Sequence, residues 1–159
     1  MKTAEEISSV VRTQLLPLSG MNLVLPNTCI AEVINLQPIE PIADAPQWLL
    51  GMTSWRGVNI PVISFEQANG ADPDAPSRTT RIAVLNSSEA GTELPFYGLL
   101  TQGIPKLLAV QKADINSVAK PATKLPLARQ QTLINDVAAV IPDQQKIESL
   151  LKKQGVTAN

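Results

Sequence analysis

The stretch that decides the fold is residues 30–65, IAEVINLQPIEPIADAPQWLLGMTSWRGVNIPVISF. The Val- and Ile-rich segments 29–36 and 59–65 at its two ends predict β-strands. Three prolines separate them and exclude regular structure over about eight residues; they are Pro38, Pro41 and Pro46. One helical turn is expected at 47–51, and a tight turn at Arg56 and Gly57. The stretch therefore predicts two strands joined through an irregular link.

Upstream of this stretch, the sequence predicts a helix followed by a β-hairpin. Thr3 and Glu6 have the spacing of a capping box, and the next apolar residues, Ile7, Val10 and Val11, form one stripe. We therefore expect an N-terminal amphipathic helix over residues 1–14. Two short strands around Ser19-Gly20 are expected to follow within residues 15–25.

Downstream, turn residues fill 66–78 and predict a loop. Further strands are expected at 81–86, 94–101, 104–110 and 132–141. A last helix is expected from Pro142, with Ile147, Leu150 and Leu151 as its apolar stripe and Gly155 at its end. Short strands, closely spaced turns and helices at the two ends together predict a mainly β fold of small barrels.

Composition excludes several classes of function. The chain has 159 residues, which is room for one domain or two small subdomains, and its net charge is −1. It lacks the basic surface that binding to nucleic acid requires. It contains no His and a single cysteine, Cys29, so the commonest general base and Cys-based zinc sites are absent. We therefore expect no enzyme activity, no metal and no cofactor.

No membrane-targeting segment is apparent in the sequence. The acidic N-terminal residues lack the apolar core of a signal peptide, and apolar runs stay far short of the ~20 residues that span a bilayer. We expect a cytoplasmic protein without direct membrane insertion.

One cation stands out by its isolation. Residues 13–65 carry only four charges, and Arg56 is the single positive one; the others are Glu32, Glu40 and Asp44. A guanidinium in an apolar segment needs a carboxylate or water, so Arg56 either forms a structural ion pair, with Glu32 as the candidate, or serves a binding surface. The two interpretations are compatible. Trp55 beside it is expected to be partly exposed, whereas Trp48 is expected to close a barrel end.

Other candidate chemistries have weaker support. Asp72-Pro73-Asp74 lacks the remaining ligands of a calcium loop. Cys29 lies in an apolar segment and is expected to be a small core residue. Neither a nucleophile elbow nor a phosphate-binding loop is present.

The order of motifs in residues 30–65 resembles the CheW-like family of chemotaxis coupling proteins. The family pattern is a strand that ends in Glu-Val/Ile, a Pro-rich link, Pro-x-Trp/Phe-Val/Leu-x-Gly, an Asn-Leu-Arg-Gly turn and a Val/Ile-Pro-Val-Val/Ile-Asp-Leu strand. The matching segments are Glu32-Val33, Pro46-Gln47-Trp48-Leu49-Leu50-Gly51, Ser54-Trp55-Arg56-Gly57 and Ile60-Pro61-Val62-Ile63. The likeness extends over 15–151.

The chain departs from the family pattern at several points, which include Pro142-Asp143 after the last strand and the expected N-terminal helix. Ser54-Trp55 replaces the usual Asn-Leu, and Ser64-Phe65 replaces Asp-Leu. These differences indicate a divergent member, for which we predict an accessory role in a type IV pilus (twitching) chemosensory system.

The resemblance implies a fold of two small SH3-like five-stranded β-barrel subdomains with a groove between them. One domain over 15–151 would then lie between the N-terminal helix and a tail at 152–159. It also implies a non-enzymatic adaptor that joins the cytoplasmic tips of chemoreceptors to the regulatory domain of a histidine kinase. The partner-binding residues carried over are Glu32 and Arg56, with Ile30, Gly57 and Val58 as their neighbours. Trp55, which stands where the family has Leu, completes the predicted partner-binding set. Two alternatives stay open: a scaffold that binds only one partner, or a small-ligand binder that uses the groove between the barrels.

Overall fold

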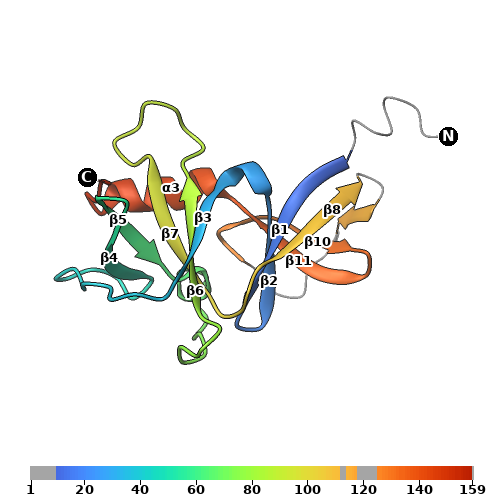
Figure 1. Ribbon diagram of the computed structural model, residues 1–159, viewed down its shortest axis with the longest axis horizontal. Helices are drawn as coiled ribbons and strands as arrows, with labels where there is room; N and C mark the ends of the chain where they lie inside the picture. Colours follow the sequence, from blue (N-terminus) through green and yellow to red (C-terminus); the bar gives the residue numbers. More distant parts are fainter. Residues whose placement is uncertain (1–9, 112–113, 118–124, 159) are drawn as a thin grey trace.

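Two β-sheets account for most of the molecule. A computed structural model describes residues 10–111, 114–117 and 125–158. The six-stranded sheet, here the first barrel, has the order β8-β1-β2-β11-β10-β9, and the five-stranded sheet, here the second barrel, has the order β3-β6-β7-β5-β4. Figure 1 shows the two side by side, with α3 behind the second barrel. The mainly β architecture of two barrel-like units is as predicted, with β9 as a sixth strand in the first.

The element bounds are as follows. The first barrel contains β1 (Val10–Leu18), β2 (Met21–Pro26), β8 (Lys106–Gln111), β9 (Ile115–Ser117), β10 (Ala128–Ile134) and β11 (Val137–Pro142). The second contains β3 (Ile30–Asn35), β4 (Leu49–Trp55), β5 (Val58–Ile63), β6 (Arg81–Asn86) and β7 (Phe96–Thr101). The helices are the 3-10 turn η1 (Asn27–Cys29), α2 (Phe65–Ala68) and α3 (Gln144–Lys153).

The second barrel closes through the irregular link that follows β3. Glu40 in that link forms two backbone hydrogen bonds with Met52 of β4, each 2.8 Å long. The approach requires Gly51, since a Cβ there would lie 2.1 Å from the carbonyl oxygen of Glu40. The proline-rich link thus returns the chain to the far edge of the same sheet.

Apolar side chains form three layers along the molecule. One cluster lies within the first barrel and includes Val24, Val110 and Ile134. Another lies within the second barrel and includes Ile60 and Val62. The largest lies between them and combines residues of both barrels with α3; its members include Leu16, Leu23, Phe65, Leu99, Ile147 and Leu151. The barrels therefore share a core.

Two carboxylates fix the helix α3, one at its first turn and one that is buried. Asp143 caps its first turn by accepting a hydrogen bond from the Lys146 amide. Glu148, only 3% exposed, accepts hydrogen bonds from the hydroxyls of Ser87, Ser88 and Tyr97 and from the Ser88 amide. Donors from β7 and the loop after β6 thus replace the water that a buried carboxylate loses.

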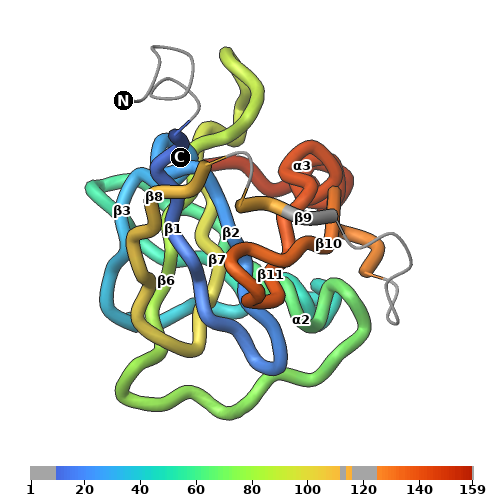
Figure 2. Tube along the Cα trace, turned by 90° about the vertical axis from the view of Figure 1, so that its right-hand side faces the viewer, coloured from blue at the N-terminus to red at the C-terminus, as the bar shows by residue number. Residues whose placement is uncertain are grey.

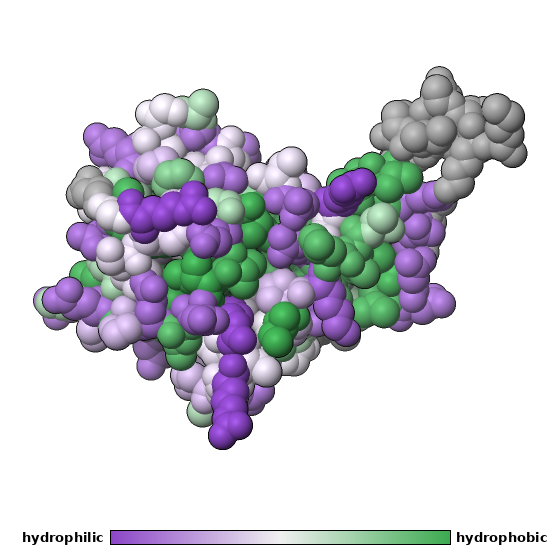
Figure 3. All heavy atoms as spheres, viewed as in Figure 1, coloured by the Kyte–Doolittle hydropathy of each residue, from purple (hydrophilic) through white to green (hydrophobic). Residues whose placement is uncertain are grey.

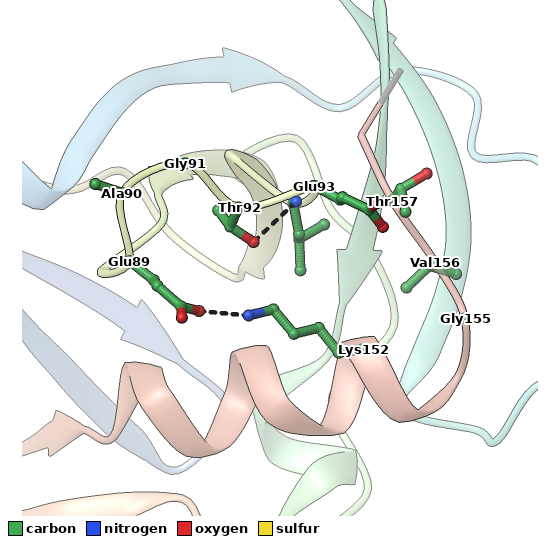
Figure 4. Close-up of a pocket in the computed structure, with 10 residues that line it drawn as sticks. Glu89, Ala90, Gly91, Thr92, Glu93, Lys152, Gly155, Val156 and Thr157 are labelled. Atoms are coloured by element: carbon green, nitrogen blue, oxygen red, sulfur yellow. Dashed lines mark hydrogen bonds and ion pairs between the residues drawn. The ribbon is translucent and has the colours of Figure 1, made fainter.

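Two further polar contacts join the loop after β6 to the end of α3. Figure 4 shows the Glu89 carboxylate paired with Lys152 across a pocket of about 400 Å³. Beyond the helix, the amide of Ala158 donates to the carbonyl of Glu93 at 3.1 Å. The tail therefore returns onto the second barrel.

Several predicted elements need correction. Residues 10–14 belong to β1 and not to a helix, because they pair with β8, about a hundred residues later in the chain. The remainder of the predicted N-terminal helix lies outside the described residues. Residues 132–141 are not one strand but parts of β10 and β11, which meet at a turn of Asn135 and Asp136 with φ of 48° and 66°.

Smaller corrections concern strand and helix ends. The helical turn expected at 47–51 is wrong from Leu49, where β4 begins. The loop expected over 66–78 contains part of α2. Pro142 ends β11 and precedes the helix cap, so α3 begins two residues later than expected and runs to Lys153.

Candidate functional site

The isolated arginine lies at the tip of the β4–β5 hairpin. Trp55 and Val58 are the last paired residues, so Arg56 and Gly57 form a two-residue turn. Their φ values are 48° and 76°, both in the left-handed region, as a type I′ turn requires. Gly57 adopts this conformation without strain, but an arginine does so at a cost of about 1 kcal/mol. The hairpin thus holds a long cationic side chain at a position that favours Asn or Gly.

Glu32 on β3 holds the arginine. Its Oε1 accepts a hydrogen bond from Nη2 of Arg56 at 2.9 Å and another from Nε1 of Trp55 at 3.2 Å. The pairing of β3 with β6 shifts between Ile30 and Glu32, which places a bulge at Ala31. A bulge redirects the side chains that follow it. The predicted ion pair with Glu32 is therefore confirmed.

Trp55 forms the floor of this site. Its ring lies 4.9 Å from Cζ of Arg56, within range of a cation–π contact. Phe96 of β7, in the same sheet, packs against this indole with ring centroids 4.9 Å apart in an edge-to-face arrangement. Trp55 is 7% exposed, so the expected partial exposure is wrong. The tryptophan supports the arginine rather than presenting its own face.

Arg56 itself is open to solvent. Its side chain is 67% exposed, against 37% for Glu32. Among the described residues only Nη2 has a hydrogen-bond partner, so the donors at Nη1 and Nε are available. A guanidinium fixed on one edge and free on the other can form a paired hydrogen bond with a carboxylate.

The other residues carried over from the family differ in placement. Gly57 is exposed and Val58 is half-buried beside the turn. Ile30 is 9% exposed and belongs to the central core, so it offers little side-chain surface. The structure therefore brings together Glu32, Trp55, Arg56, Gly57 and Val58, and places Ile30 in the central core instead.

Sequence reasoning missed two residues, one that supports this site and one that anchors α3. Phe96 supports Trp55 from a strand far along the chain, and no local pattern predicts that contact. Glu148 is buried beside Tyr97, and the available signal was an acidic residue next to the apolar stripe of the last helix.

Cys29 and Trp48 lie at the margin of the central core. Both are half-buried against that cluster. Burial, together with the charge of Glu148, raises the pKa of the Cys29 thiol. The thiol therefore stays protonated at neutral pH, which makes it a poor nucleophile.

The described residues hold neither a metal-ligand cluster nor a membrane-spanning helix. No three His, Cys, Asp or Glu side chains there are grouped as metal ligands. None of the helices in those ranges is long and apolar enough to cross a membrane.

Comparison with known proteins identifies the family. The model of the CheW-like domain matches residues 13–151, so the chain belongs to the CheW-like family. Among solved structures, it is similar to the scaffolding protein TtCheW from Thermoanaerobacter tengcongensis. That match has a TM-score of 0.70 and 18% identity, and covers 83% of each chain. A search of curated proteins found no match.

Proposed function

We propose that this protein is a non-enzymatic adaptor of a chemosensory array, which couples the cytoplasmic tip of chemoreceptors to the regulatory domain of a histidine kinase. Membership of the CheW-like family supports a scaffold role in chemotaxis signalling. The receptor and kinase are partners that the family resemblance implies. On this proposal the protein acts in the cytoplasm.

The observation that carries the proposal is the arrangement of Glu32, Trp55 and Arg56. The ion pair, the tryptophan floor and the tight turn fix the guanidinium before any partner arrives. A fixed side chain loses little conformational entropy on binding, so its contacts contribute more to affinity. Arginine is also among the residues enriched at binding hot spots.

Figure 3 shows apolar surface on one face of the molecule. In the view of Figure 1, apolar side chains gather in two areas, one over each barrel. Exposed Leu36 lies shortly after β3, and exposed Leu107 lies on β8. Apolar areas with a polar margin are typical of protein interfaces.

The test is direct binding of the purified protein to a receptor cytoplasmic tip and to the kinase regulatory domain. Arg56→Glu should weaken binding to at least one partner tenfold or more, or about 1.4 kcal/mol. Arg78→Glu, the same change at an exposed arginine in the loop between α2 and β6, should bind like the wild type. Circular dichroism should show that both variants are folded.

Each result leads to a distinct conclusion. Binding to both partners establishes the adaptor, and binding to only one replaces it with a single-partner scaffold. If neither binds, the adaptor role is wrong. If both bind and Arg56→Glu has no effect, the adaptor stands but its contact surface lies elsewhere.

The pilus-linked role is a separate proposal. The departures at Ser54-Trp55 and Ser64-Phe65 indicate a divergent member of the family. Deletion of the gene should then reduce the spread of twitching colonies while flagellar swimming continues. Loss of swimming with normal twitching would contradict this assignment.

A further inference from the structure

A second groove lies on the opposite side of the molecule from β3. It has a volume of about 490 Å³, and Ala68 at the end of α2, Pro126 and Leu127 before β10, and Leu150 of α3 contribute its apolar lining. Figure 2 shows α2, α3 and the start of β10 on one side, with β3 on the other. The groove is therefore separate from the surface around Arg56.

Two lysines of α3 give the groove its charge. Lys146 and Lys153 both line it and both are exposed. They lie seven residues apart, or two turns of one helix face, which corresponds to about 10 Å along the axis. Within the described part of the chain neither lysine forms an ion pair. Positive charges thus stand at both ends of an apolar strip.

Nearby charges cancel only part of this pair. Asp143 also lines the groove and offsets one of the two positive charges, while its Oδ1 accepts the hydrogen bond that caps α3. Lys152, the third lysine of the helix, pairs with Glu89 on the other side of α3 (Figure 4). The groove therefore keeps a net positive charge that its own neighbours do not neutralise.

We propose that this groove docks an acidic amphipathic helix of a partner protein. The apolar strip fits side chains repeating at i, i+3, i+4 and i+7, which is the usual pattern of helix-in-groove recognition. Carboxylates two turns apart on the partner would meet Lys146 and Lys153. The proposal does not depend on the receptor or kinase as partners, and it gives the chain a docking surface beyond that of Arg56.

The test uses fluorescent 16-residue peptides and the full chain. Three acidic peptides carry Leu, Ile or Phe on the apolar face, and each has a partner peptide in which Lys replaces every Glu. Fluorescence anisotropy should show saturable binding of at least one acidic peptide. Lys146→Glu with Lys153→Glu should weaken it at least tenfold. Raising the salt concentration should also weaken it, because exposed charges are screened.

Two controls isolate the groove. Arg78→Glu with Lys106→Glu makes the same charge change at exposed positions elsewhere, and should alter affinity less than twofold. Arg56→Glu should also bind the peptide normally, which separates this surface from the adaptor site. All variants should stay folded by circular dichroism, because the substituted side chains are exposed.

Several results would overturn the proposal. They are no saturable binding by any acidic peptide, equal binding of the Lys-substituted peptides, and unchanged affinity in the double variant. Two others would assign the groove to a different occupant. One is a dimer in sedimentation equilibrium that the double variant abolishes, and the other is binding only to phosphatidylglycerol vesicles, lost in the same variant.

Discussion

At the scale of single residues, the conformation of Arg56 indicates that this residue contributes to partner binding but little to the stability of the fold. Its φ of 48° suits Asn better than Arg, and its exposed ion pair with Glu32 contributes only about 0–1 kcal/mol. Arg56→Asn should therefore change the free energy of unfolding by less than about 1 kcal/mol, while partner binding falls at least tenfold. Urea denaturation and the binding assay check the two halves of this prediction.

The opposite pattern would change the interpretation of Arg56. If Arg56→Asn lowered the free energy of unfolding by several kcal/mol and left partner affinity unchanged, the arginine would be a structural residue only. Trp55→Phe serves as a companion variant, since it keeps an aromatic floor but removes the indole donor to Glu32.

The close contact at Gly51 leads to a prediction about stability. Its φ is 145°, and an added Cβ would collide with the backbone carbonyl of Glu40. Gly51→Ala should break the Glu40–Met52 backbone pair and cost at least about 2 kcal/mol. Gly91→Ala is the matched control, because its φ is also positive but a Cβ there meets nothing within 4 Å. Equal melting temperatures for the two variants would contradict this account of closure.

Tyr97 gives a prediction about alkaline pH. Burial, and then the nearby charge of Glu148, raise the pKa of its phenol above the ordinary value of about 10. The folded chain keeps this proton where the unfolded chain has lost it, so the free energy of unfolding should fall as the pH rises above about 10. Tyr97 is the single tyrosine of the chain, so tyrosinate absorbance reports this group alone. Its appearance should coincide with the loss of circular dichroism; ionisation in a still-folded chain would contradict the burial.

The residues of the site were only partly predictable. The scarcity of charge in 13–65 singled out Arg56 and left Glu32 as one of few possible partners. The depth of Trp55 was not predictable, because it depends on Phe96 from another strand and on the bulge at Ala31. Local sequence carries information about turns and charge, but contacts between distant strands decide burial.

At the scale of elements, β3, β5, β6 and β7 were predictable, whereas β4 and two other regions were not. Residues 49–51 of β4 were expected in a helical turn. Val10 and Val11 fit a helical stripe, but pairing with Gln111 and Val110 of β8 outweighs that local preference. The turn between β10 and β11 lies within an apolar run and has no glycine, so its signal was only Asn135-Asp136. Both residue types tolerate the left-handed conformation that the turn needs.

The attachment of α3 yields a prediction at the same scale. Glu148→Gln keeps the shape of the side chain but replaces an acceptor oxygen with an amide group that itself donates. In the variant, the donating amide group faces the hydroxyl and amide donors that bind the carboxylate in the wild type. The free energy of unfolding should therefore fall by about 1–3 kcal/mol. Hydrogen exchange should show faster opening of α3 than of β6 and β7. Glu93→Gln is a suitable control, because Glu93 is exposed and bonds through its backbone.

At the scale of the whole molecule, the two barrels share one core. Leu16 and Leu23 come from the first barrel, Leu99 from the second, and Leu151 from α3, and all are fully buried in the central cluster. Separating the barrels would expose this layer to water, at about 25 cal/mol for each Å² of apolar surface. An adaptor built in this way holds its surfaces at fixed relative positions.

This shared core predicts that the barrels unfold together. In urea, native-state hydrogen exchange of β1 in the first barrel and β6 in the second should converge on one free energy of unfolding. Leu151→Ala should lower that value by about 2–5 kcal/mol for both strands, because the cavity lies in the layer between them. Leu133→Ala, a truncation at an exposed position on β10, should have little effect on either. If the free energy of unfolding fell in only one barrel, the subdomains would be independently stable and α3 would only connect them.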